Sequence, residues 1–60
     1  MFTKREEEVM HLITKGFTNK EIAKKLTISE HTVKAHLESI YRKLGVHNRV
    51  QAVLRLVDAK

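Results

Sequence analysis

The chain has no cysteine, proline or tryptophan, and only two phenylalanines and one tyrosine among its 60 residues. Without cysteine it has neither a disulfide framework nor a thiolate metal site, which agrees with a reducing compartment. No apolar run approaches the ~18 residues that cross a bilayer, and the N-terminus lacks the apolar core of a secretory signal. We therefore expect a cytoplasmic chain that does not bind membranes.

The scarcity of aromatic residues also bears on nucleic-acid type. A sheet of stacking aromatics, which single-stranded RNA recognition uses, is absent. The few aromatics are instead predicted to lie in the core: Phe2, Phe17 and Tyr41. RNA is therefore a weaker candidate ligand than duplex DNA.

Catalytic and metal-binding arrangements are missing as well. The sequence has no glycine-rich phosphate loop, and its hydroxyl residues lack a general base at a suitable spacing. His31 and His36 are five positions apart, so they do not share a helix face as metal ligands at i and i+4 do. The acidic run at residues 6–8 suits the positive end of a helix rather than a catalytic pair. We expect no enzyme activity, no cofactor and no bound metal.

What the chain does have is basic charge, with a formal net charge of +5 and a pI near 9.9. Residues 15–49 hold eight Lys and Arg against three Glu, whereas residues 1–14 hold two against three. A basic middle segment favours a polyanionic partner, which is nucleic acid more often than an anionic membrane. On charge alone, a merely solvated surface is an equal alternative.

Helix start and stop signals divide the chain into four segments. Thr3 with Glu6, and Thr18 with Glu21, fit the capping box, while Ser29 and Asn48 are further N-cap candidates. Gly16 and Gly45 follow periodic apolar segments, where a left-handed residue ends a helix. The predicted helices span residues 4–15, 19–26, 30–44 and 49–59, and no stretch alternates like a strand. The sequence thus predicts one all-α, four-helix domain over residues 1–60.

The short connection between the second and third helices is the most informative feature. Only residues 27–29 separate them, which forces a steep crossing and gives the pattern of a helix-turn-helix. Many such turns contain Gly, but here Thr27 stands in that place, so we expect the turn to close without a left-handed residue. The third helix buries one stripe, Val33, Leu37, Ile40, Tyr41 and Leu44, and exposes the opposite one, His31, Lys34, Ala35, Glu38 and Arg42.

This arrangement suits DNA, because a second helix locked across the first fixes which face enters the major groove. The start of the second helix, at Thr18, Asn19 and Lys20, offers unpaired backbone N–H groups and a positive dipole end, which suit phosphate. A polar face on one helix is usually only solvated. The turn, the caps and the local charge together favour the functional interpretation.

The sequence resembles the C-terminal DNA-binding domain of the LuxR family of bacterial regulators, also called the NarL or FixJ output domain. The most specific match is Asn-Lys-Glu-Ile-Ala at residues 19–23, followed by Thr-Val-Lys-x-His at residues 32–36. The resemblance covers nearly the whole chain, over residues 3–10, 16–23, 26–37, 40–46 and 48–53. Glu38 departs from the basic or small residue common there, although a carboxylate can accept from cytosine N4. Met10 replaces a frequent Leu at similar volume.

The resemblance implies sequence-specific binding of double-stranded DNA by the output domain of a transcription regulator, with the third helix in the major groove. Base contacts are expected from Lys34, Ala35 and Glu38, with His31 on the same face. The resemblance implies phosphate contacts near five residues: Asn19, Lys20, Ser29, Thr32 and Lys43. We expect three further phosphate contacts beside them: Thr18, Arg42 and Arg49. The implied partners are DNA, a second copy of the chain in a homodimer, and RNA polymerase.

The fourth helix carries more apolar surface than one contact with a small core requires. One interpretation is a deeply packed terminal helix. The other has two surfaces, with Ala52, Val53 and Leu56 facing the core and the rest facing a second copy: Val50, Leu54 and Val57. A twofold dimer would match two half-sites about one DNA turn apart.

The sequence leaves two alternative functions, and it allows two kinds of protein to contain this chain. A promoter-recognition domain of the sigma-factor type also places a helix-turn-helix on four helices. A helical module whose basic face binds an acidic protein is a second alternative. The chain is either a fragment of a response regulator of a two-component system or of a quorum-type receptor, or a small stand-alone regulator.

Overall fold

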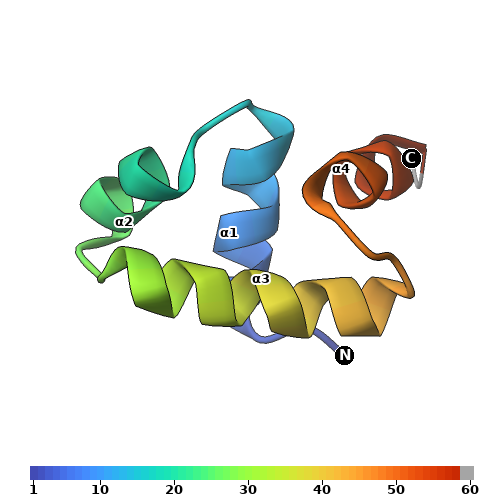
Figure 1. Cartoon of the computed structure of the whole chain (residues 1–60), viewed down its shortest axis with the longest axis horizontal. Helices are drawn as coiled ribbons and strands as arrows, with labels where there is room; N and C mark the ends of the chain where they lie inside the picture. The colour runs from blue at the N-terminus through green and yellow to red at the C-terminus, as the bar shows by residue number, and fades with distance from the viewer. Residues whose placement is uncertain (59–60) are drawn as a thin grey trace.

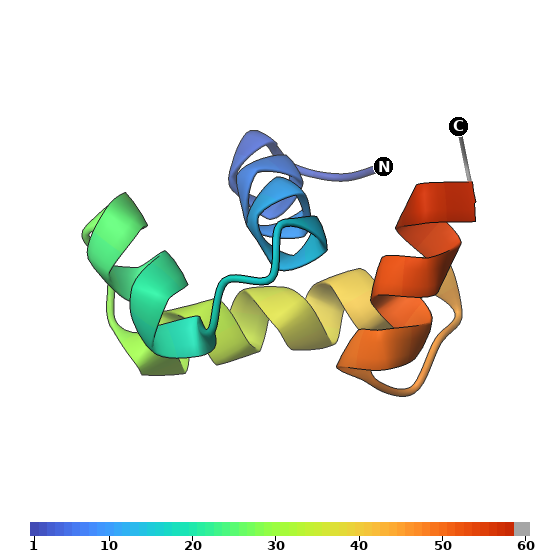
Figure 2. The same ribbon diagram turned by 90° about the horizontal axis from the view of Figure 1, so that it is seen from above.

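The computed structural model describes residues 1–58, which form four α-helices around one core. The helices are α1 (Lys4–Thr14), α2 (Asn19–Leu26), α3 (Glu30–Leu44) and α4 (Arg49–Asp58). α3 runs along one side of the domain and contacts α1, α2 and α4, and α1 also contacts α4. α2 lies beside the N-terminal part of α3 and α4 beside its C-terminal part, with α1 between them (Figures 1 and 2). Residues 1–58 contain no strand and no helix long and apolar enough to cross a membrane.

The predicted helix boundaries are confirmed with one difference. α1 ends at Thr14 instead of Lys15, because the Lys15 N–H turns back to the Leu12 carbonyl oxygen at 3.1 Å and begins the exit turn. Gly16 then adopts a φ of +87°, and Gly45 a φ of +72° after α3, which are left-handed values that glycine adopts at little steric cost. The predicted last residue of the fourth helix, at position 59, lies outside the described residues.

The N-terminal caps form as predicted. The Thr3 hydroxyl accepts from the Glu6 N–H at 3.0 Å, while the Thr3 N–H donates to Glu6 Oε1 at 2.9 Å. Thr18 and Glu21 repeat this capping box at 3.1 and 2.8 Å, and Ser29 Oγ accepts from the Thr32 N–H at 3.0 Å. Each box satisfies two donors that a helix end leaves unpaired.

The turn between α2 and α3 corrects the expectation drawn from the sequence. Thr27 adopts a left-handed conformation, with φ 59° and ψ 46°, although it is not glycine. The reason lies in the next residue, because the Ile28 N–H donates to the Ala23 carbonyl oxygen at 2.9 Å and Ile28 packs against the core. These contacts hold a conformation that is rare for a β-branched residue.

The core contains residues from all four helices, as the apolar periodicity predicted. α1 contributes Val9, Met10, Leu12 and Ile13; α2 contributes Ile22 and Ala23; α3 contributes Val33, Leu37 and Ile40; α4 contributes Ala52. Tyr41, Leu44 and Leu26 were predicted to be inward and are partly buried at its edge, together with Phe2 and Phe17. This core fixes α3 along one face only, so its opposite face remains exposed.

Candidate nucleic-acid interface

The exposed face of α3 carries the predicted base-reading residues on one stripe. His31, Lys34, Ala35 and Glu38 are all exposed, and Arg42 continues the stripe one turn later. Their spacing of three, four and seven positions places them on one side of the helix, while Val33, Leu37 and Ile40 on the other side are buried. The stripe is therefore held outward by the packing of the opposite side.

The start of α2 lies beside this stripe. Thr18 caps the helix with its side chain, and helix geometry leaves the amides of Asn19 and Lys20 without an intrahelical acceptor. Lys20 is exposed and Asn19 is half-buried. These three predicted phosphate contacts are thus brought together at the end of a helix whose dipole favours anions.

A shallow depression connects the two surfaces. Its lining includes Asn19 from α2, Lys34 and Glu38 from α3, and His47 from the loop before α4. Tyr41 also lines it, which the sequence did not indicate, because its position on the apolar stripe suggested core alone. Desolvation raises the pKa of the Tyr41 phenol, although the nearby charge of Arg49 opposes this. The phenol therefore remains protonated at neutral pH and able to donate a hydrogen bond.

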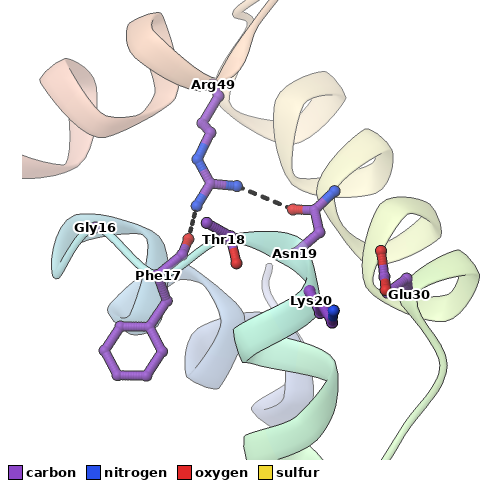
Figure 3. Close-up of a pocket in the computed structure, with 7 residues that line it drawn as sticks. All are labelled: Gly16, Phe17, Thr18, Asn19, Lys20, Glu30 and Arg49. Atoms are coloured by element: carbon purple, nitrogen blue, oxygen red, sulfur yellow. Dashed lines mark hydrogen bonds between the residues drawn. The ribbon is translucent and has the colours of Figure 1, made fainter.

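Arg49, at the start of α4, was predicted to bind phosphate, but its guanidinium is occupied by protein groups (Figure 3). Nη1 donates to Asn19 Oδ1 at 3.0 Å, and Nη2 donates to the Phe17 carbonyl oxygen. The residue is half-buried, and these bonds join the start of α4 to the segment that precedes α2. No pattern in the sequence indicated this contact, because the partners are far apart along the chain.

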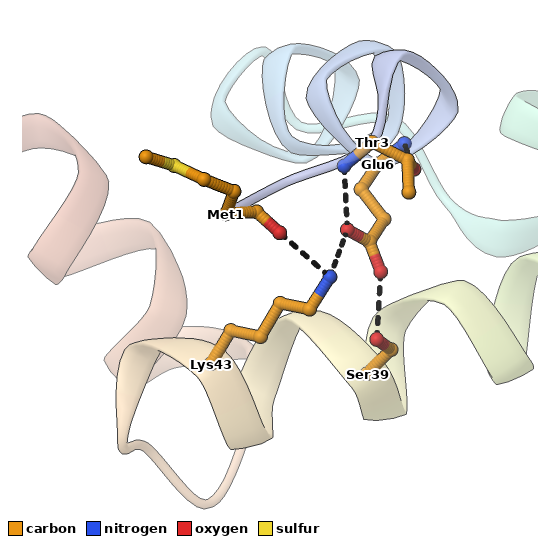
Figure 4. A network of polar contacts seen from close by, with 5 residues as sticks. All are labelled: Met1, Thr3, Glu6, Ser39 and Lys43. Atoms are coloured by element: carbon orange, nitrogen blue, oxygen red, sulfur yellow. Dashed lines mark hydrogen bonds and ion pairs between the residues drawn. The ribbon is translucent and has the colours of Figure 1, made fainter.

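Lys43 was also predicted to contact phosphate, and the structure gives it a different environment (Figure 4). Its Nζ lies 2.7 Å from Glu6 Oε1 and donates to the Met1 carbonyl oxygen at 2.9 Å. The ammonium group also lies 5.7 Å from the centroid of the Phe2 ring. Lys43 therefore anchors α3 to the N-terminal segment, because its ammonium group pairs with the buried Glu6 carboxylate.

Glu6 is the residue whose role the sequence described only in part. Its capping function was predicted, but its carboxylate is buried, with 4% of the residue exposed, and also accepts from Ser39 Oγ at 2.6 Å. The hydrogen bonds from Lys43, Ser39 and the Thr3 N–H lower the pKa of this carboxyl to about 2, from an ordinary value of 4.5. Glu6 thus remains ionised throughout the neutral range and ties α1 to α3.

The remaining predicted phosphate contacts lie at the start of α3. Ser29 is exposed and Thr32 is half-buried, and their hydroxyl oxygens lie 2.9 Å apart. Each hydroxyl still has hydrogen-bonding capacity beyond this pair, since a hydroxyl has one donor and two acceptor positions. Among residues 1–58, no three His, Asp or Glu side chains converge in a way that could hold a metal ion.

The two predicted surfaces of α4 are present. Ala52 is fully buried, and Val53 and Leu56 pack against the core. Three apolar side chains on the other side are exposed: Val50 at 68%, Leu54 at 58% and Val57 at 51%. The deeply packed alternative is therefore wrong for this helix, because its second apolar side faces solvent.

Comparisons with known proteins agree with this arrangement. Residues 1–56 match the family model GerE, described as bacterial regulatory proteins of the luxR family. The glycerol metabolism activator of Pseudomonas putida is 54% identical over 93% of this chain, and the chain spans 25% of that relative's length. The spore germination protein GerE of Bacillus subtilis is 49% identical over 95% of this chain and 77% of its own length.

A solved structure supports the same relationship. The DNA-binding domain of the response regulator ComA, in complex with the anti-activator RapF, superposes with a TM-score of 0.88 at 42% identity, and the match covers 92% of this chain and 95% of that one. The luxR match over residues 1–56 decides between this family and the sigma-factor alternative. The chain belongs to the luxR family of bacterial regulatory proteins.

Proposed function

We propose that the chain binds double-stranded DNA with sequence preference, placing α3 in the major groove. The observation that carries the proposal is the exposed stripe of α3, which is held outward by a buried opposite face and flanked by the start of α2. A major groove admits one α-helix, and the domain is 28 Å along its longest axis. The stripe would read base edges through His31, Lys34, Ala35 and Glu38.

Phosphate contacts would flank this stripe on both sides. The start of α2, with Thr18, Asn19 and Lys20, would bind one stretch of backbone through its free amides and the lysine charge. Ser29, Thr32 and Arg42 along α3 would bind others. Lys43 and Arg49 are less suitable for this role, because their side chains already bond to protein groups.

A titration with duplex DNA tests the proposal directly. Duplexes selected from a random pool would be added to the labelled protein, and the backbone amide resonances would be followed. We expect those of His31, Lys34 and Glu38 to shift, whereas those of His11 and Thr14 on α1 stay in place. Unmoved resonances along α3, with every duplex tested, would remove the proposal.

We also propose that two copies bind paired half-sites through α4. The support is the exposed apolar side of Val50, Leu54 and Val57, which is small and predicts weak self-association without DNA. A Leu54→Glu variant should bind a single half-site like the wild type but lose cooperative binding to two half-sites about one turn apart. Equal cooperativity in both proteins would rule this interface out.

A protein partner for this domain is a second candidate. The favouring observation is that the related ComA domain was solved in complex with RapF. A Lys34→Ala variant distinguishes the two candidates. Undiminished duplex binding by this variant would favour the protein partner, whereas weakened binding favours DNA. With the DNA-binding function we also propose that the domain acts within a transcription regulator that contacts RNA polymerase.

A further inference from the structure

Asn19 lies between Arg49 on one side and Lys34 on the other, and its contacts on these two sides differ. It lines one shallow depression together with Arg49, Phe17 and Lys20, and a second one together with Lys34 and Tyr41. On the first side its Oδ1 accepts from Arg49 Nη1 at 3.0 Å. Asn19 is thus the residue through which the start of α4 meets the proposed DNA surface.

The bond to Arg49 fixes the orientation of the Asn19 amide. A guanidinium has donors only, so it must bond to the oxygen of the amide and not to the nitrogen. The two Nδ2 hydrogens are therefore turned away from Arg49, and Figure 3 shows this nitrogen on the α3 side of the residue. An amide without this contact would be free to turn over, which exchanges its donor and acceptor positions.

The second bond of Arg49 fixes the backbone at the same place. Nη2 donates to the carbonyl oxygen of Phe17, which directly precedes the N-cap residue Thr18. Arg49 thus holds both the entry to α2 and the first side chain of the helix. Two bonds from one planar group restrain position and orientation together, which a lysine ammonium does not reproduce.

We propose that Arg49 is a positioning residue for DNA binding, which orients the Asn19 amide so that its Nδ2 donors meet a backbone phosphate. Arg49 itself would not contact phosphate. The inference rests on the proposed function, since it assigns a role within the same DNA surface. It differs from the prediction made from the sequence, which placed Arg49 among the phosphate contacts.

Salt dependence separates the two roles. The slope of log affinity against log salt is negative, and a lost phosphate contact makes it flatter by about 0.9. A lost orienting contact to a neutral amide leaves the slope unchanged. The variants are Arg49→Met, Arg49→Lys, Asn19→Ala and a double variant that combines Arg49→Met with Asn19→Ala. Arg55→Met is the matched control, because Arg55 is an exposed arginine of α4 that donates to the Leu44 carbonyl oxygen.

Dissociation constants for one selected duplex would be measured at several salt concentrations. We expect Arg49→Met and Arg49→Lys each to weaken binding about 5- to 30-fold, with the wild-type salt slope. Asn19→Ala should weaken binding by a similar factor and add nothing when combined with Arg49→Met, because coupled residues are not additive. Arg55→Met should bind like the wild type.

Three results would overturn the inference. They are a salt slope flatter by about one in Arg49→Met together with wild-type affinity in Arg49→Lys, additive losses in the double variant, and unchanged affinity in both Arg49 variants. Urea unfolding of every variant would identify losses that come from the fold. If Arg49→Met is unfolded, Arg49→Lys keeps the test decisive, because a phosphate contact would retain its affinity with lysine and an orienting contact would not. A wild-type protein that binds no duplex would instead remove the proposed function.

Discussion

Two exposed lysines on α3 differ in their contacts. Lys34 is exposed, and among residues 1–58 it forms no ion pair, since the two ion pairs found there join Arg5 to Glu8 and Lys43 to Glu6. Lys43, on the same helix, is bound to a buried carboxylate and to a backbone carbonyl. The difference arises from the partner helix, because Lys43 faces Glu6 on α1 whereas Lys34 faces away from the core.

The comparison shows why the number of basic residues overstates the positive charge available to DNA. The total of 12 Lys and Arg counts both lysines equally, but the Lys43 charge is compensated at short range by Glu6. A buried carboxylate needs such a partner, because an unpaired buried charge is strongly unfavourable. The fold therefore uses one lysine to compensate a buried charge and leaves the other without an ion-pair partner among residues 1–58.

The largest expected effect comes from the core beneath both lysines. Ile40 is fully buried on the core side of α3, so Ile40→Ala should lower the free energy of unfolding by about 2–5 kcal/mol. The exposed substitution Lys34→Ala on the same helix should change it by less than about 0.5 kcal/mol. Urea unfolding followed by circular dichroism measures both. Equal losses in the two variants would contradict the assignment of Ile40 to the core and of Lys34 to the exposed face of α3.

The next effect concerns DNA affinity at the exposed lysine. Lys34→Ala should cost about 1–3 kcal/mol at a matched site and relax the base preference there. Lys15→Ala, at the exposed C-terminal end of α1, serves as a control and should bind nearly like the wild type. Fluorescence anisotropy with matched and mismatched duplexes provides the measurement. A loss that is identical for all sequences would make Lys34 a phosphate contact rather than a base reader.

Acid should weaken the ion pair between Glu6 and Lys43 and thereby lower the stability of the fold. The Glu6 carboxyl has a pKa of about 2 in the folded protein, against an ordinary value of 4.5. Between these two values the unfolded chain binds the proton first, so stability is retained above pH 4.5 and falls as the pH drops toward 2. Glu6→Gln should be less stable than the wild type at neutral pH, and this deficit should shrink over that window.

Urea unfolding at a series of pH values measures this dependence. Glu7→Gln is the matched control, because Glu7 is an exposed neighbour in the first turn of α1. This control should follow the wild-type curve. A constant difference between Glu6→Gln and the wild type at every pH would show that the ion pair with Lys43 does not stabilise the fold.

The smallest effect on DNA binding is expected at Lys43. If Lys43 is an anchor, Lys43→Met leaves the salt slope of DNA binding unchanged while lowering the midpoint of urea unfolding. A phosphate contact at Lys43, which the family resemblance implies, predicts instead weaker binding to all sequences and a slope flatter by roughly one. Measuring the slope and the unfolding midpoint of the same variant decides between the two roles.

Local signals in the sequence were sufficient for the fold. The capping boxes at Thr3 and Thr18, the two glycines and the apolar spacing placed the helix boundaries within residues 1–58 to about one residue, because these signals act over three or four positions. Thr27 is the exception. Its left-handed conformation depends on the packing of Ile28, which is a tertiary contact that turn statistics do not contain.

The candidate site was predictable in part. The exposed stripe with Lys34 and Glu38 followed from helical periodicity, since that periodicity also determines which side is buried. The environments of Lys43 and Arg49 did not follow. Their side chains meet partners 37 and 30 positions away along the chain, respectively, and a single sequence holds no information on which distant residue will lie opposite a lysine or an arginine.

The Glu6 carboxylate has a consequence for local opening. The terminal turn of a helix usually frays, and its amides then exchange with solvent long before the domain unfolds. Here one side chain holds the Thr3 N–H, the hydroxyl of Ser39 and the ammonium of Lys43 at once. Deuterium should therefore enter the hydrogen-bonded amides of Glu6 and Glu7 no faster than it enters the C-terminal half of α3, and the two segments should open as one unit.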